Sequence, residues 1–297
     1  MQLWNIEPSK KVIFACLMAI FLMTMLPFAT AHSGDTIIAP SLTVIPIIDG
    51  NWTGTEWDDA PQYNITGSGG TGYIRVKYDS NYLYIIIDSV WDLTWVPLWG
   101  SYEGTYVAFD TAHDGGTAPQ TDDYLFFCGF SKWSYAWQGN GTQWMPIFGT
   151  GFDGEQFNGT SPNSGTVHRI DEMKIPLAYV GSIASSSGFY VIVRDDSSDP
   201  DGGGPNPPTA WVEWPTGAGG NPDGWPVDPG YIDPCPAPNA WGDLNLYALP
   251  VGGISTPVDK LRLLAPYIAL VAAIGAVMIG VVYAWKHRFR KAAILKL

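Results

Sequence analysis

The chain has 297 residues, and its formal net charge of −13 is distributed unevenly. Residues 33–259 contain 27 of the 28 acidic and 6 of the 15 basic side chains, so this region has a formal charge of −21. Because phosphate backbones are bound through Lys and Arg, such an acidic surface excludes nucleic acid as a partner. It favours cations and neutral ligands instead.

The first residues have the order of an export signal. Two lysines precede an apolar run over residues 12–28, and residues 29–31, Ala-Thr-Ala, form a small-x-small cleavage motif. Signal peptides have a basic start, an apolar centre and such a site. We therefore expect residues 1–31 to be a signal peptide and the mature chain to start near His32. An uncleaved anchor helix is the alternative.

The other end of the chain predicts a membrane anchor. Residues 263–285 contain no charge, and about 20 apolar residues cross the hydrocarbon core of a bilayer. A basic tail, residues 286–297, follows, and an excess of Lys and Arg marks the cytoplasmic side. We expect a single-pass type I protein of the cell membrane, with an extracellular domain (32–251) and a linker (252–262). Small residues at four-residue spacing in the helix would let two copies pack as a homo-oligomer.

The outer domain has the pattern of an all-β antiparallel sandwich. Residues 73–78 alternate between apolar and polar, residues 82–90 are rich in Tyr and Ile, and a short polar link joins them. This arrangement predicts an antiparallel hairpin. Gly and Pro recur every few residues, as in β-sandwiches. Further strands are expected over residues 36–48, 63–66, 103–110, 123–130, 132–138, 167–175 and 189–194.

Several short motifs follow one another in a fixed order along the domain: Ile48-Asp49-Gly50, Trp52, Glu56-Trp57, Ala60-Pro61, Tyr82-Leu83-Tyr84, Glu172 to Leu177, and Trp241 to Leu246. This order resembles carbohydrate-binding module family 9 and the related DOMON-like domains. The resemblance implies a non-catalytic β-sandwich that binds a ligand, with closing strands near residues 210–215 and 241–246. We interpret Trp57 and Trp241 as core residues.

Aromatic residues provide a candidate glycan platform. Strand parity places Trp133, Tyr135 and Trp137 on one face, and Trp91 and Trp95 mark the loop after the hairpin. Flat aromatic rings suit the apolar face of a sugar, and family 9 modules similarly hold sugar between Trp rings. The alternative is that these rings cover the other sheet as core. We expect a cell-surface glycan, or another surface component, as the partner.

An acidic loop provides a candidate calcium site. Asp110, Asp114, Asp122 and Asp123 bracket a Gly-rich turn between two expected strands. Ca²⁺ prefers several oxygen ligands from carboxylates and carbonyls. The family resemblance also implies structural calcium. The alternative is a solvated loop in which Asp serves as a turn residue.

Two kinds of covalent modification are expected in an exported domain. Cys128 and Cys235 are the two cysteines outside the apolar segments and allow one disulfide. Glycosylation sequons occur in stretches expected to be loops, at Asn51, Asn64, Asn140 and Asn158.

Two further functions remain as alternatives. Some DOMON-like domains bind haem through Met and His, which would make the protein an electron-transfer module; the candidate ligands are His113, His168, Met145 and Met173. The other alternative is a structural or adhesion protein of the cell envelope. The sequence contains no phosphate-binding, zinc-protease or serine-hydrolase motif, so we do not expect an enzyme.

Overall fold

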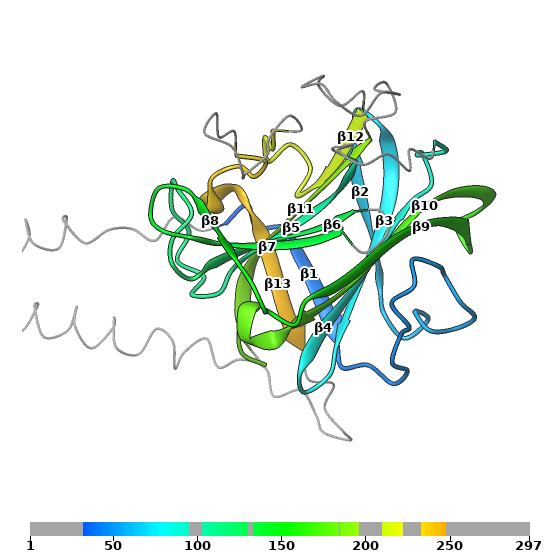
Figure 1. Cartoon of the computed structure of the whole chain (residues 1–297), viewed down its shortest axis with the longest axis horizontal. Helices are drawn as coiled ribbons and strands as arrows, with labels where there is room; N and C mark the ends of the chain where they lie inside the picture. Colours follow the sequence, from blue (N-terminus) through cyan, green and yellow to red (C-terminus); the bar gives the residue numbers. More distant parts are fainter. Residues whose placement is uncertain are drawn as a thin grey trace, which may run out of the picture. The chain divides into compact units, whose positions relative to one another are not determined.

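The computed structural model describes residues 32–94, 103–129, 133–183, 185–195, 210–221 and 233–247 (Figure 1). The chain divides into two compact units, and all of these residues belong to the first, Met1–Leu249. The expected signal peptide, linker, membrane helix and cytoplasmic tail lie outside the described residues. Within the described part, no helix is both long and apolar enough to cross a bilayer.

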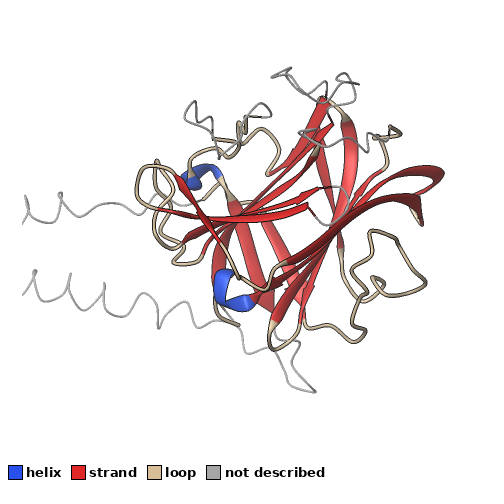
Figure 2. Cartoon of the chain, in the orientation of Figure 1, coloured by secondary structure: helices blue, strands red, loops and turns tan. Residues whose placement is uncertain are grey.

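The described residues form an all-β fold, with helix only in two single turns, η1 (Leu177–Tyr179) and η2 (Pro238–Ala240) (Figure 2). The strands are β1 (Thr36–Pro40), β2 (Gln62–Gly67), β3 (Gly70–Tyr78), β4 (Tyr82–Ser89), β5 (Gly104–Asp110), β6 (Asp123–Gly129), β7 (Trp133–Gly139), β8 (Trp144–Ile147), β9 (Asp153–Ser161), β10 (Ser164–Pro176), β11 (Ser186–Asp195), β12 (Ala210–Trp214) and β13 (Gly242–Tyr247).

Most of these strands coincide with the predicted ones. The expected hairpin is β3 and β4, which pair antiparallel from Tyr73 opposite Asp88 to Tyr78 opposite Leu83. Two strands were not predicted. β8 has four residues and contains a proline, and β9 is largely polar, so neither has a clear apolar alternation.

The strands hydrogen-bond in the order β8-β7-β6-β5-β11-β12-β2-β3-β4-β10-β9, and β13 pairs with both β11 and β1. A single residue pair, Glu213 opposite Thr66, joins β12 to β2, and the sheet folds over itself there. The two resulting layers enclose one apolar core, to which Val107 and Phe126 contribute from one side and Ile85 and Met173 from the other. The fold is therefore an antiparallel sandwich, with β1 and β13 as a parallel pair.

A second apolar cluster covers the outer face of the layer that contains β5 and β6. Tyr106, Leu125 and Trp137 from the sheet pack with Cys235 and Trp241 from the later chain. Trp241 is fully buried, which confirms its predicted core role. The segment before β13 thus closes a sheet face that strand parity alone would leave open.

The predicted disulfide is wrong. Cys128 and Cys235 are both free and buried. Cys128 belongs to the core between the layers, whereas Cys235 belongs to the cluster on the outer face of the same layer. Because the sheet itself separates the two thiols, they cannot approach to the Cα separation that a disulfide requires.

The motifs behind the family resemblance meet at one buried carboxylate. Glu172 Oε2 accepts hydrogen bonds from the backbone N–H groups of Asp49 and Gly50, both at 3.0 Å, and Oε1 accepts one from Trp57 Nε1 at 2.8 Å. Gly50 has φ +75°, and a Cβ there would lie 2.7 Å from the backbone nitrogen and Cβ of Phe157, so only glycine fits. Trp57 is fully buried, as predicted.

Candidate functional site

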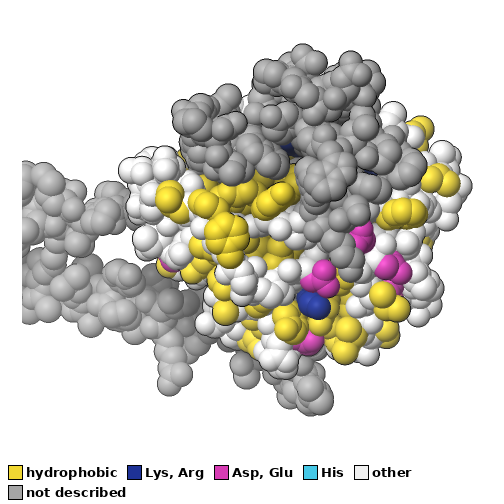
Figure 3. Space-filling view, viewed as in Figure 1, with side chains coloured by type: hydrophobic (Ala, Val, Ile, Leu, Met, Phe, Trp, Pro, Cys, Tyr) yellow, Lys and Arg dark blue, Asp and Glu magenta, His cyan; other side chains and the backbone are white. Residues whose placement is uncertain are grey.

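A cavity of about 360 Å³ lies beside β7 and β8. Its lining comes from both strands and from the loop after β8 and includes Tyr135, Pro146, Phe148 and Phe152. Hydrophobic side chains gather on the surface in the region of β7 and β8 (Figure 3). Pockets of roughly 300–1,000 Å³ with apolar walls and a few polar groups are typical of small-ligand sites, so this cavity is the candidate ligand site.

The exposed rings at this cavity differ in part from the predicted platform. Tyr135 is 41% exposed and belongs to the lining, as expected for a platform residue. Trp137 shares its face but is only 1% exposed, because the outer apolar cluster buries it. Phe148, which the sequence analysis missed, is 89% exposed. Tyr135 and Phe148 are therefore the most exposed rings of the lining, which also contains the buried Trp137 and the half-buried Phe152. The role of Trp137 as a contact residue stays a prediction.

The other predicted platform residues do not extend this surface. Trp91 is half-buried against the core and lies over the β2–β3 turn, where a Cβ on Gly69 would meet its ring at 2.7 Å. Five strands separate β3 from β7 in the sheet order, so Trp91 belongs to a different part of the fold. Trp95 and the side chain of Trp133 lie outside the described residues.

Three of the four predicted calcium ligands converge at the β5–β6 loop, residues 111–122. Carboxylate oxygens of Asp110, Asp114 and Asp122 all lie within 4.8 Å of one another. Asp123 is fully buried, and its Oδ1 atom has no hydrogen-bond partner among the described residues. A hard, oxygen-only donor set with an unpartnered buried carboxylate oxygen fits Ca²⁺.

The pKa values in this loop reflect crowding of negative charge. Burial raises the pKa of Asp123 to about 8, and the charges of Asp110, Asp122 and Asp114 add to the rise against one backbone hydrogen bond. Burial also acts to raise the pKa of Asp110, but hydrogen bonds from His32, Gly115 and His113 outweigh it and lower that pKa below its usual value. A bound cation would favour the ionised form of Asp123 and so oppose both the effect of burial and the repulsion from the neighbouring charges.

The acidic loop supports the strands that line the cavity. Gly141 N–H, in the β7–β8 turn, donates to Pro119 O at 2.8 Å, and the Gln138 amide of β7 donates to Thr121 O. A Cβ at Gly139 would lie 2.1 Å from Gln120 O, so the loop packs directly on the end of β7. The loop is thus in direct contact with the β7–β8 hairpin.

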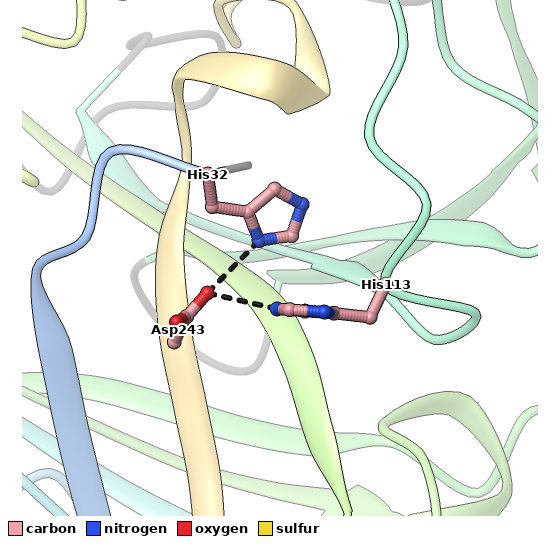
Figure 4. Close-up of side chains that lie close together, drawn as sticks. All are labelled: His32, His113 and Asp243. Atoms are coloured by element: carbon pink, nitrogen blue, oxygen red, sulfur yellow. Dashed lines mark hydrogen bonds and ion pairs between the residues drawn. The ribbon is translucent and has the colours of Figure 1, made fainter. Parts of the chain in front are cut away.

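Three further side chains meet near the acidic loop from distant parts of the chain: His32, His113 and Asp243 (Figure 4). Asp243 Oδ1 lies 3.1 Å from Nδ1 of His32 and 2.8 Å from Nε2 of His113. The two imidazole rings are 4.3 Å apart, centroid to centroid, and nearly perpendicular. No pattern in the sequence predicted this cluster.

The four candidate haem ligands have separate environments. His113 contacts Asp243, and the buried His168 is hydrogen-bonded to Asp88 and to Thr166 O. Met173 is enclosed in the core, whereas Met145 is 44% exposed on β8. No observation on these residues favours an axial pair.

The glycosylation sequons are only partly in loops. Asn51 and Asn140 lie in loops, as predicted, but Asn64 lies in β2 and Asn158 in β9. Asn64 and Asn140 are exposed, whereas Asn51 and Asn158 are half-buried. The loop prediction is therefore wrong for two of the four.

No family model and no curated protein sequence matches the chain. Among solved structures, it is similar to a carbohydrate binding module family 9 (CBM9) from Caldicellulosiruptor kristjanssonii in complex with cellotriose, with 13% identity and a TM-score of 0.48. The structure of such a module in complex with glucose gives 14% identity and the same TM-score. The matches cover 76% and 75% of this chain and 100% of the other chains.

Proposed function

We propose that this protein binds a neutral glycan, without catalysis, in the cavity beside β7 and β8. It would act as an exported protein anchored in the cell membrane by residues 263–285, with the sandwich outside. Ca²⁺ held by Asp110, Asp114, Asp122 and Asp123 would brace the adjoining loop. The observation that carries the proposal is a cavity of about 360 Å³ with two accessible aromatic rings in its lining.

The aromatic rings suit one face of a sugar. A pyranose presents a flat C–H face, which packs on an aromatic ring, and hydroxyl groups at its edge. Phe148 and Tyr135 supply exposed rings, and the lining also contains the hydroxyl-bearing residues Ser134 and Thr150. Thr150 lies between Gly149 and Gly151, which have φ values of +68° and +75°. This backbone favours glycine and carries Phe148 beside the cavity.

The charge distribution favours a neutral ligand. Among the described residues that line the cavity, none has a charged side chain, so a charged sugar would lose hydration without gaining an ion pair from them. The surrounding domain has a formal charge of −21, which would repel anionic polysaccharides.

The test is calorimetric titration of the full chain with a panel of neutral oligosaccharides, beginning with cellotriose. The detergent must have no sugar headgroup, since alkyl glycosides would compete for the cavity. Phe148→Ala removes the most exposed ring, and Phe157→Ala is the matched control, because Phe157 is 44% exposed on β9 and does not line the cavity.

We expect Phe148→Ala to weaken binding about fivefold, which corresponds to roughly 1 kcal/mol for an aromatic contact, and Phe157→Ala to leave it unchanged. Removal of Ca²⁺ should weaken binding through the β5–β6 loop. If no glycan binds, or if both Phe variants lose the same affinity, the proposal is wrong. Specific association with another surface protein through Phe148 would then favour the adhesion alternative.

A further inference from the structure

The cluster of His32, His113 and Asp243 has the donor atoms of a transition-metal site. One ring nitrogen from each histidine and a carboxylate oxygen of Asp243 lie within 4.8 Å of one another. Asp243 Oδ1 is 3.1 Å from Nδ1 of His32 and 2.8 Å from Nε2 of His113. The three residues come from the segment before β1, the β5–β6 loop and β13. Imidazole nitrogen is a ligand for Cu, Zn and Ni, whereas the neighbouring calcium cluster offers only oxygen.

We propose that His32, His113 and Asp243 bind a Cu(II) ion, and that the α-amine of His32 becomes a fourth ligand once the signal peptide is removed after Ala31. The amine and Nδ1 belong to the same residue, so one metal ion can be chelated by both in a six-membered ring. Three nitrogens and one carboxylate oxygen are the donor types that Cu(II) takes in its tetragonal N,O sites.

Asp110 positions both imidazoles for this role. Its Oδ2 atom lies 3.2 Å from Nε2 of His32, the ring nitrogen that faces away from Asp243. Its Oδ1 atom accepts the backbone N–H of His113 at 2.7 Å. A carboxylate on the second nitrogen of a metal-binding histidine fixes the ring and its tautomer.

The backbone of His113 is a second, independent sign of a specialised position. Its φ of +56° is the only positive value at a non-glycine residue in the part of the chain that the structure describes. Such a conformation is uncommon for non-glycine residues, with His among those that adopt it more often, and it is stabilised by surrounding contacts. Here it accompanies a ring nitrogen 2.8 Å from Asp243 Oδ1, and the side chain of His113 remains 34% exposed, so a metal ion can reach it.

The test uses the full chain, expressed in a host that processes the signal peptide and purified in detergent. Intact mass establishes the N-terminus, chelator removes bound metals, and Ca²⁺ is restored before Cu(II) is titrated against a competing chelator. Electron paramagnetic resonance then counts the nitrogen ligands. The variants are His113→Asn, which tolerates a positive φ, Asp243→Asn and Asp110→Asn. The controls are His287→Ala, in the basic tail, and Asp114→Asn, in the calcium cluster.

We expect one Cu(II) per chain, with a mature N-terminus at His32 and hyperfine coupling from three nitrogens. Asp110→Asn should weaken binding about 10–100-fold, as for other carboxylates that support metal ligands, and His113→Asn and Asp243→Asn should weaken it at least as much. The two controls should bind Cu(II) normally, and His113→Asn should retain its response to Ca²⁺. Absence of binding, or equal binding by His113→Asn and His287→Ala, would overturn the site. An N-terminus elsewhere, or two nitrogens, would overturn the amine ligand.

Discussion

Two carboxylate-rich regions of the protein balance their negative charge in different ways. Between the sheet layers, Arg169 pairs with Asp171 (Nε to Oδ2, 3.0 Å) and Asp92 (Nη1 to Oδ2, 3.6 Å), and all three side chains are fully buried. Glu103 lies in the same charge cluster, and Gln156 donates to it at 2.9 Å. This region contains its own cation.

The β5–β6 loop has only a histidine as its internal partner, because Asp110 pairs with His32 at 3.2 Å and His32 is a cation only when protonated. Its acids meet in a cluster of Asp110, Asp114 and Asp122, and no ion pair with Lys or Arg is present there among the described residues. Protons or a bound cation must neutralise it. Arg169 thus allows one acidic region to be part of the core, whereas the charge state of the other depends on the pH and the cations of the solution.

The largest expected effect comes from removing the internal cation. Arg169→Met leaves buried carboxylates uncompensated, so we expect unfolding by urea to show a loss of about 3–5 kcal/mol. The control is Lys174→Met, which removes a partly exposed ion pair with Asp153 (3.6 Å) and should cost about 0–1 kcal/mol. A similar small loss for both variants would mean that Arg169 does not balance the buried acids.

Calcium should stabilise the folded protein by binding at the β5–β6 loop. At a hundred times its Kd, Ca²⁺ should add about 2.7 kcal/mol to the free energy of unfolding, seen as a higher Tm than in EDTA. Asp122→Asn should reduce this shift. Asp153→Asn, which changes a carboxylate outside the loop, should not. An equal response to Ca²⁺ in both variants would remove calcium from the loop.

Without calcium, stability should fall as pH rises from about 5 to about 8. Burial raises the pKa of Glu103 from 4.5 to about 8 against the opposing charge of Arg169, and burial raises that of Glu172 to about 8 against its hydrogen bonds. In this window the folded protein keeps protons that the unfolded chain has lost. Each such proton gives a slope of up to about 1.4 kcal/mol per pH unit. Glu103→Gln should flatten the profile, and a stability that rises with pH would contradict this assignment.

The smallest effect on stability is expected from the exposed member of the loop cluster. In EDTA, Asp114→Asn should change the free energy of unfolding by no more than about 0.5 kcal/mol, because its side chain is exposed. It should still lower the affinity for Ca²⁺ by removing one oxygen ligand. A large loss of stability in EDTA would show that Asp114 has a structural contact of its own.

Local patterns predicted the hairpin and the core. In β3, buried and half-buried residues alternate, and β4 is buried after its first residue. Apolar patterns within single segments therefore suffice to find both strands. β9 escaped prediction because its residues are held by pairing with β10 rather than by an apolar face.

The candidate site residues were predictable only where the residues that contact one another are close in the sequence. The acids that bracket the β5–β6 loop are close in sequence, so their convergence was visible. The burial of Trp137 was not, because the cluster that covers it includes Cys235 and Trp241, about a hundred residues later. The contact of His32 with Asp243 spans 211 residues, and the only sequence signal for it was a histidine directly after the cleavage motif.

The most direct test of glycan binding is a crystal structure of the full chain with saturating cellotriose. Our account predicts a sugar ring against Phe148 and Tyr135 in the cavity beside β7 and β8, with its hydroxyl groups near Ser134 or Thr150. Cellotriose bound at Trp91, or a cavity that stays free of sugar under conditions where the protein binds it in solution, would contradict the proposed site.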